Sequence, residues 1–340
     1  MTSGWTEVRR RSLRRVCWFR AGVLLWLVLH GCSAEAQEQS AGTGQTIRVE
    51  VKRVLVGVIV TDSKGKFVEG LQRADFQIFD NGALQPITDF ASVDAPGQVF
   101  LLMEAGPAVY FLQDSHLFVA DSLLEGLSAG DRVAIARYTD APAVLLNFTT
   151  DKRAAQAALD RIQFNLGYGD LNLAKSLNAI LDGLAQVPGK KTIVLVSTGV
   201  DTSPQADTKS LLPRLQTGDV RLLSIAMSGP LRNGKQGRKR QIQQTQQVFE
   251  QADTWLTALA EATGGRAYFP ENAKAFQETY RQVAQLVRHE YSLAFAPPAA
   301  DGALHSIEVK VDSVAGTAKN KAPEYRVDHR KAYVAPKPAE

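Results

Sequence analysis

Oxygen-bearing side chains follow several of the predicted strands, at the points where each strand gives way to a loop. Glu104 follows a short apolar run, Asp170 lies in a loop before a predicted helix, and Thr198 and Asp201 follow an apolar strand at residues 191–197. Because the carboxyl ends of parallel strands meet at one edge of a sheet, these side chains are expected to lie near one another. Carboxylate and hydroxyl oxygens are the ligands that Mg²⁺ and Ca²⁺ prefer. One hypothesis is therefore a divalent-cation site in which Glu104 acts with Asp170 or Asp201.

The same edge has a second interpretation, in which the polar side chains serve the backbone. Asp170, Asn172 and Asp201 belong to the residue types that cap turns and helix starts, and residues 173–184 show helical periodicity directly after the loop. A capping side chain uses its oxygens to accept from backbone N–H groups. We favour this interpretation and expect no cofactor at the edge, Mg²⁺ and Ca²⁺ included.

Other catalytic arrangements lack a residue that they need. The stretch at residues 189–192 is similar to the end of a phosphate loop, but the upstream Gly183 is one residue too far away and the stretch enters a strand. The five histidines have no metal-ligand spacing, and no Gly-x-Ser-x-Gly turn supplies a nucleophile. The sequence therefore predicts a protein that is not an enzyme. An envelope hydrolase is a third functional class, for which the sequence carries no signature.

The middle of the chain predicts an α/β domain. Apolar runs at residues 99–103, 132–138, 191–197 and 220–227 are typical of buried strands, and apolar residues recur at helical spacing between them. Strands that alternate with helices form a mainly parallel sheet that is covered on both faces. The prediction is a doubly wound, Rossmann-like α/β fold.

Both ends of the chain return to β structure. Residues 54–60 form an apolar run, and further strand patterns at residues 291–295, 307–311 and 325–333 follow the last predicted helix. A lone N-terminal piece of about 45 residues would be marginally stable, so we expect it to pair with the C-terminal strands in one β-sandwich. The predicted divisions are a signal peptide at 1–36, a linker at 37–45, the sandwich at 46–95 and 290–335, the inserted α/β domain at 96–289, and a tail at 336–340.

The order and spacing of these strand–loop pairs resemble those of a von Willebrand factor type A domain. More narrowly, the chain resembles the bacterial VWFA-related family described from Acidobacteria. The resemblance covers residues 46–335, and its matching stretches are residues 60–65, 71–80, 190–202, 259–268 and 291–295.

The resemblance implies a metal-ion-dependent adhesion site, in which an Asp-x-Ser-x-Ser loop, a threonine on a second loop and an aspartate on a third loop hold Mg²⁺. The open position of the ion takes a carboxylate from the partner. This sequence departs from the pattern at every position, with Glu104 for the first aspartate, Gly106 and Ala108 for the serines, Leu171 for the threonine and Thr198 for the last aspartate. One carboxylate and one hydroxyl remain, so we expect the adhesion site to be degenerate.

We therefore predict a non-enzymatic protein-binding or scaffold protein of the bacterial cell envelope. Its partner would be a protein or an envelope polymer, held by shape and by polar and apolar contacts. The alternative is the metal-dependent adhesion module that uses Glu104 with Asp170 or Asp201. The predicted contact residues at the edge of the sheet are Glu104, Gly106, Ala108, Tyr168, Asp170, Leu171, Thr198 and Asp201.

The first 36 residues have the pattern of a secretory signal peptide. Six arginines precede an apolar run at residues 21–29, and small residues follow it. Residues 34–36 fit the rule for signal cleavage, whereas the context of Cys32 resembles a lipobox in which Cys32 would be lipidated; both alternatives stay open. We expect an exported protein, periplasmic or secreted, that meets the membrane only through its signal peptide or a lipid anchor.

The basic character of the chain belongs to this leader. The formal net charge is +4, but residues 1–31 hold six arginines and one glutamate, so the remainder carries −1. A strongly basic balance is the main compositional sign of nucleic-acid binding, and we expect no nucleic acid as a partner. A basic, glutamine-rich stretch at residues 231–247 is predicted to be a solvated loop, a helix extension, or an electrostatic contact for an acidic partner, anionic lipid or envelope polymer.

Overall fold

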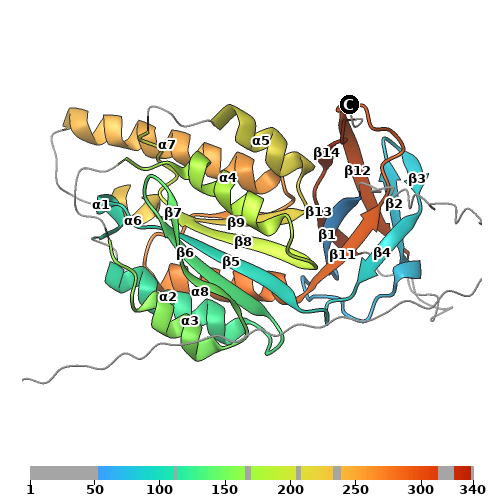
Figure 1. The fold of residues 1–340 in the computed structure, drawn as a ribbon, viewed down its shortest axis with the longest axis horizontal. Coiled ribbons are helices and arrows are strands. Elements are labelled where there is room, and N and C mark those ends of the chain that lie inside the picture. Colours follow the sequence, from blue (N-terminus) through green and yellow to red (C-terminus); the bar gives the residue numbers. More distant parts are fainter. Residues whose placement is uncertain are drawn as a thin grey trace, which may run out of the picture. The chain divides into compact units, whose positions relative to one another are not determined.

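The computed structural model describes residues 53–110, 113–164, 170–203, 208–232, 239–312 and 325–337. These residues form three β-sheets and the helices that cover the largest of them (Figure 1). The predicted signal peptide, the linker and Cys32 lie outside the described residues. Within the described residues, no helix combines the length and the apolar character needed to cross a bilayer.

The main sheet has six strands, and its order confirms the predicted doubly wound fold. From one edge to the other, the strands are β10 (Ala267–Tyr268), β9 (Val220–Ala226), β8 (Lys190–Ser197), β5 (Gly97–Glu104), β6 (Arg132–Tyr138) and β7 (Pro142–Thr149). All neighbours pair in parallel except β6 and β7. Every residue of β5, β8 and β9 is buried, which agrees with their unbroken apolar runs.

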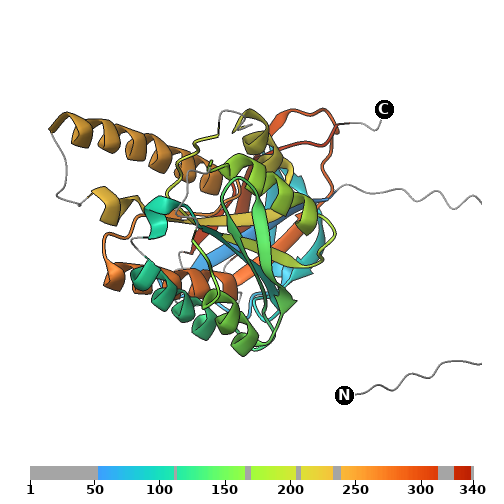
Figure 2. The ribbon, with the colours of Figure 1, turned by 60° about the vertical axis from the view of Figure 1, so that its left-hand side comes forward.

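Helices cover both faces of the main sheet (Figure 2). Successive strand residues point to opposite faces, so Leu101 and Met103 of β5 join one apolar cluster while Phe100 and Leu102 join another. The helices packed in the first cluster are α2 (Gln113–Gly126), α3 (Lys152–Leu159) and α8 (Ala273–Arg288), and those in the second are α4 (Leu173–Leu184), α5 (Thr208–Thr217) and α7 (Lys239–Glu261). Two short helices, α1 (Pro107–Tyr110) and α6 (Ser228–Arg232), follow β5 and β9.

The two smaller sheets are antiparallel, and they confirm that both ends of the chain build one sandwich. The first sheet has the order β13 (Arg326–His329), β1 (Val54–Thr61), β11 (Glu290–Phe295) and β4 (Ile87–Ala91). The second has the order β14 (Ala332–Val334), β12 (Leu304–Val311), β2 (Phe76–Asp80) and β3 (Ala83–Gln85), with the 3-10 helix η1 (Arg73–Asp75) before β2. One apolar cluster draws on both sheets.

Strand β1 is buried on its sandwich face and partly buried on the other, which agrees with its apolar run. Its four valines belong to the sandwich core, whereas Ile59 on the opposite face is also buried and lines a cavity with Leu223 of β9. Gly57 lies on that same face, and a Cβ there would be 1.8 Å from Glu290 Oε1. Lys190 Nζ at the start of β8 donates to Glu290 O at 3.2 Å. The first sheet of the sandwich therefore packs against the amino-terminal end of the main sheet.

One arginine joins the sandwich to the helices of the main sheet. The buried Arg330, between β13 and β14, donates to Gly218 O (2.8 Å), Leu215 O (2.9 Å), Gln216 O (3.1 Å) and Ala262 O (3.2 Å). These carbonyls lie at the carboxyl ends of α5 and α7, where the helix leaves them without N–H partners and gives them partial negative charge. Burial lowers the pKa of Arg330 to about 10, so the guanidinium is still charged at neutral pH.

The turn after α7 can approach Arg330 only because it contains glycine. Gly264 has a φ of +71°, a conformation that other residues rarely adopt. A Cβ at Gly264 would also lie 2.3 Å from Arg330 N. Both the backbone conformation and the close contact therefore require a glycine here.

We expect Arg330→Met to lower the free energy of unfolding by about 2–4 kcal/mol, because four buried carbonyls lose their donor. Arg330→Lys should have an intermediate effect, since one ammonium reaches only some of the four acceptors. Urea unfolding of the full chain, followed by circular dichroism, measures both changes. A methionine variant as stable as the wild type would contradict this role of Arg330.

Candidate functional site

The candidate site lies at the carboxyl-terminal edge of the main sheet, between β5 and β8. The chain passes from β5 to β6 on one side and later to β8 on the other side of β5. The sheet order therefore reverses at this pair of strands, and ligands of such sheets bind beyond the strand ends at this position. Glu104 ends β5 and Ser197 ends β8, so two of the three predicted loops begin here.

The Glu104 carboxylate is buried and hydrogen-bonded within the protein. It is 1% exposed and accepts from Thr198 N (2.7 Å), Thr198 Oγ1 (2.8 Å), Ser197 Oγ (3.0 Å) and Tyr138 Oη (3.2 Å). Tyr138 Oη and Ser197 Oγ lie 2.7 Å apart, and Ser197 Oγ accepts from Gly199 N at 2.8 Å. The network thus connects the ends of β5, β6 and β8.

Burial and hydrogen bonding act in opposite directions on this carboxyl group. Burial raises the pKa of Glu104, and the hydrogen bonds from Thr198, Ser197 and Tyr138 reduce that shift without cancelling it. The pKa of the Tyr138 hydroxyl is raised well above its usual value by burial first and by the charge of Glu104 second. The folded protein therefore binds a proton at Glu104 more readily than the unfolded chain does.

An apolar side chain covers the first loop of the site. Leu171 is buried, and a Cβ at Gly106 would lie 2.8 Å from Leu171 Cδ2. Leu171 N donates to Thr202 Oγ1 at 2.8 Å, and Leu171 O accepts from Thr202 N at 3.0 Å and from Ser203 N at 3.1 Å. These bonds hold the loop before α4 against the loop after β8. Where the resemblance implies a threonine ligand, the chain has a leucine that packs on the first loop.

Two of the polar residues at this edge cap helix α4. Asn172 is its N-cap, and Asn172 Oδ1 accepts from Lys175 N at 2.9 Å. Asp201 Oδ2 accepts from Ala174 N at 3.3 Å, and Asp201 Oδ1 accepts from Ser203 N at 3.3 Å. The capping interpretation is confirmed for Asn172 and Asp201.

The structure places the predicted contact residues at different depths. Asp170 is exposed and Asp201 is half-buried, so these two form the described outer part of the edge. Ala108 lies in α1, and Tyr168 lies outside the described residues. The remaining members are buried and form the floor beneath the edge: Glu104, Gly106, Leu171 and Thr198. A partner that docks on this edge therefore meets Asp170 and Asp201 before it meets Glu104.

Three residues that complete the network were not predicted from the sequence, namely Tyr138, Ser197 and Thr202. Tyr138 ends β6 and lies directly opposite Glu104, the last residue of β5. Aligning the two apolar runs by their carboxyl ends could have identified this pair from the sequence. Ser197 is a hydroxyl residue that directly follows the apolar centre of β8, and this position at the end of the strand could have indicated a role at the edge. Thr202 gives no comparable signal, because its partner Leu171 is 31 residues away.

Two carboxylates of this edge, Glu104 and Asp201, accept hydrogen bonds from protein donors. Glu104 Oε2 accepts from Thr198 N and shares the Thr198 hydroxyl with Oε1, and each oxygen of Asp201 accepts from one backbone N–H. Across the part of the chain that the structure describes, no group of three or more His, Cys, Asp or Glu side chains is placed to hold a metal ion. Mg²⁺ requires several oxygen ligands in near-octahedral geometry. At this edge the oxygens of Glu104 and Asp201 already accept hydrogen bonds from the protein, and Leu171 offers no oxygen from its side chain.

The basic, glutamine-rich stretch is helical over much of its length. Helix α6 ends at Arg232, and α7 begins at Lys239 and runs through Glu261, so the helix extension is confirmed from Lys239 onward. Residues 233–238 lie outside the described residues. The first turns of α7 extend beyond the other helices of the same face (Figures 1 and 2).

Comparison with known proteins matches residues 117–282 to the von Willebrand factor type A domain. This part of the chain is similar to domains of that family, in the region where the resemblance places the α/β domain. The matched range begins after Glu104, Gly106 and Ala108, the three positions of the first loop. A search of the curated proteins found no match.

Three solved structures illustrate the likeness in fold. An aerotolerance-related membrane protein from Bacteroides fragilis is 12% identical, with a TM-score of 0.42 over 55% of this chain and 98% of its own. BatB from Bacteroides thetaiotaomicron is 11% identical, with a TM-score of 0.43 over 56% of this chain and 98% of its own. A von Willebrand factor type A protein from Catenulispora acidiphila is 10% identical, with a TM-score of 0.46 over 85% of this chain and 75% of its own.

We expect Glu104 to make stability depend on pH. Its pKa is raised on folding, so its favourable contribution is complete below the usual value of 4.5 and is lost as pH rises through the higher folded value. Glu104→Gln keeps an acceptor for Thr198 N and removes the titration. The free energy of unfolding of the wild type, relative to Glu104→Gln, should therefore fall as the pH rises above about 4.5.

Glu104→Ala provides the contrast to the glutamine variant. It leaves the Thr198 N–H and the hydroxyls of Ser197 and Tyr138 without their acceptor in a buried site, so we expect a loss of about 2–4 kcal/mol. Urea unfolding at several pH values measures both variants. A stability difference between wild type and Glu104→Gln that does not change with pH would contradict the raised pKa.

Proposed function

We propose that this protein is a non-enzymatic binding or scaffold protein of the bacterial cell envelope, whose partner docks at the carboxyl-terminal edge of the main sheet without a metal ion. The observation that carries the proposal is the closed hydrogen-bond network of Glu104. In an adhesion site of the implied kind, the carboxylate and hydroxyl oxygens face a cation. Here Ser197, Thr198 and Tyr138 direct their donors at the carboxylate instead.

The side chain of Leu171 supports the same proposal. It packs on Gly106 of the first loop, and an apolar side chain offers no ligand to a cation. Domains of the von Willebrand factor type A kind are usually binding modules without catalytic activity. The scaffold is thus suited to recognition by shape and polar contact, with the partner a protein or an envelope polymer.

The sequence motifs extend the proposal to family and location. We infer that the chain groups with the VWFA-related family described from Acidobacteria, on the stretches at residues 60–65, 71–80 and 190–202. The basic and apolar leader supports export to the periplasm or the medium, and Cys32 would carry a lipid if the lipobox is used. The intact mass of the mature chain separates lipidation at Cys32 from cleavage after residue 36.

A cation titration separates the proposal from the metal-dependent alternative. We expect Mg²⁺, Mn²⁺ and Ca²⁺ to give no saturable rise in the unfolding temperature of the full chain. A saturable rise that is lost in Glu104→Gln, or in Asp201→Asn, would establish the metal-dependent adhesion module and overturn the proposal. The glutamine variant is preferred to alanine because it preserves the volume and part of the network.

A matched pair of charge reversals tests the docking edge. Asp170→Arg alters an exposed residue of the edge, whereas Glu308→Arg alters an exposed residue of the sandwich strand β12. We expect Asp170→Arg to reduce the recovery of a partner from envelope extract at least fivefold and Glu308→Arg to leave it unchanged, as measured by quantitative mass spectrometry. Equal recovery by both variants would place the partner elsewhere on the protein.

A further inference from the structure

Four basic side chains are buried where the main sheet meets the sandwich. Lys190 and Lys191 begin β8, Arg221 lies on β9, and Arg330 precedes β14. Their exposed fractions are 6%, 5%, 5% and 3%, in that order. All four line one small cavity. Buried charges are costly unless opposite charges or hydrogen-bond partners compensate them, so the remaining lining of this cavity decides its chemistry.

Two carboxylates of the cavity lining compensate only half of this charge. Asp219 forms an ion pair with Lys191. Glu290 Oε1 lies 3.1 Å from Arg221 Nε, and Glu290 is itself buried. With four cations and two carboxylates, the lining carries two excess positive charges.

The two other cations contact neutral acceptors. Lys190 Nζ donates to Val93 O and to Glu290 O, both at 3.2 Å, and Arg330 donates to the carbonyls at the ends of α5 and α7. Burial lowers the pKa of Lys190, while Glu290, Asp131 and Asp94 act from a distance to raise it. No ion pair between Lys190 and a carboxylate is formed among the described residues, so these interactions leave the local excess of positive charge in place.

Several donors in the cavity lack an acceptor. Arg221 Nη2 and Arg330 Nε are buried and have no hydrogen-bond partner among the described residues. Arg221 Nε lies 3.1 Å from Glu290 Oε1 in the ion pair. A Cβ at Gly57 would lie 1.8 Å from Glu290 Oε1 and 2.9 Å from Arg221 Nη2, so the glycine leaves room for this pair.

The size of the cavity limits what can bind there. Its volume is about 20 Å³, which is room for one particle of about the size of water. A water molecule would use acceptors as well as donors, whereas a monatomic anion needs donors alone, and the unpartnered polar atoms of this lining are donors. Guanidinium and ammonium groups are donors without acceptor capacity, and they supply four of the lining side chains.

We propose that this cavity binds one small monoanion, chloride, between Arg221 and Arg330. The anion would accept from Arg221 Nη2 and Arg330 Nε and would reduce the excess charge of the lining from two to one. It would thereby link strands β1, β9 and β11 with the segment that carries Arg330. Chloride binding is thus coupled to the packing of the sandwich on the main sheet. The proposal is independent of any partner at the opposite edge.

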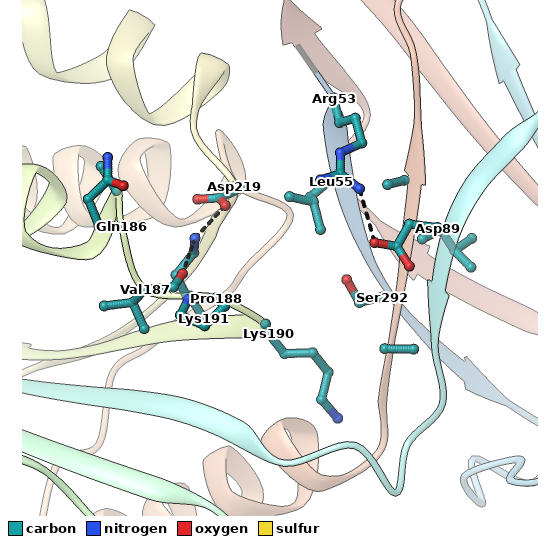
Figure 3. A pocket seen from close by; sticks show the side chains of 15 residues that line it. Arg53, Leu55, Asp89, Gln186, Val187, Pro188, Lys190, Lys191, Asp219 and Ser292 are labelled. Carbon is teal, nitrogen blue, oxygen red and sulfur yellow. Dashed lines mark hydrogen bonds and ion pairs between the residues drawn. The ribbon is translucent and has the colours of Figure 1, made fainter. Parts of the chain in front are cut away.

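A larger cleft shares part of its lining with the cavity (Figure 3). The cleft has a volume of about 390 Å³ and shares Lys190, Lys191 and Asp219 with the inner cavity. Figure 3 shows the Lys191–Asp219 pair on the side of the main sheet and the Arg53–Asp89 pair on the side of the sandwich. In the proposed binding, the anion would enter from this cleft, which has an ion pair on each side.

Thermal unfolding of the full chain in different sodium salts tests the proposal. The protein is first dialysed into a chloride-free buffer, and chloride, bromide or gluconate is then added at equal ionic strength. We expect chloride and bromide to raise the unfolding temperature saturably by at least about 3 °C over gluconate, because gluconate is too large for the cavity. Equal unfolding temperatures in the three salts, as expected for a bound water, would overturn the proposal.

A charge-balanced pair of variants assigns the effect to the cavity. Arg221→Gln with Glu290→Gln removes both members of the buried ion pair, and we expect it to weaken the apparent chloride affinity at least tenfold. Arg281→Gln with Glu278→Gln removes an exposed ion pair on α8 and should leave the affinity unchanged. A halide effect of the same size in both double variants would overturn the assignment.

Crystals of the wild-type protein grown in sodium bromide provide a test that does not depend on the folding of a variant. We expect an anomalous bromide peak within hydrogen-bond distance of Arg221 Nη2 and Arg330 Nε. A peak without anomalous signal at this position identifies water and refutes the proposal.

Discussion

The architecture depends on the burial of charge at the junction between the main sheet and the sandwich. Strand β1 covers the sandwich core with its valines, and its other face meets the ends of β8 and β9. That second contact buries Arg221 with Glu290 and inserts Arg330 against the ends of two helices. A buried charge costs several kcal/mol unless it is compensated, so the relative position of the two layers is tightly specified.

The two ends of the main sheet therefore use polar groups for different purposes. At the amino-terminal end, cations outnumber carboxylates and have donors left over. At the carboxyl-terminal end, a single carboxylate receives donors from two neighbouring strands and the residue after one of them. In an adhesion site a cation would compensate the charge of the carboxylate, whereas here hydrogen bonds from Tyr138, Ser197 and Thr198 stabilise it. Leu171 packs on the first loop with an apolar group. The exposed residue Asp170 lies outside the hydrogen bonds of Glu104, so a substitution there would leave that network intact.

Much of the fold could be predicted because it follows from local patterns. The apolar run at residues 54–60 predicts a largely buried strand, and the alternation of strands and helices predicts the doubly wound sheet. Asn172 could be predicted as a cap from its residue type and from the helix that begins directly after it. Such features depend on neighbours in the sequence and on the period of burial.

The details of both polar sites could not be predicted, because they depend on tertiary register. Glu104 was placed at the edge, but its partner Tyr138 is identified only once β5 and β6 are aligned residue by residue. The contacts at the junction are harder still to predict, because Arg221, Glu290 and Arg330 belong to three separate segments that no sequence periodicity relates to one another. Each of these residues, taken alone in the sequence, has the appearance of an ordinary surface charge.

The pairing of β1 also determines the order in which the chain can fold. Val56 of β1 pairs with Leu293, and Val58 pairs with His329, so the strand must wait for partners that are synthesised more than 230 residues later. The main sheet between them draws on a continuous segment and has no such delay. Long-range pairing of this kind slows folding and leaves an apolar strand unpaired in the interval. A chain that is cut short before Glu290 would keep the strands of the main sheet but would expose the apolar run of β1, which makes it a substrate for aggregation or proteolysis.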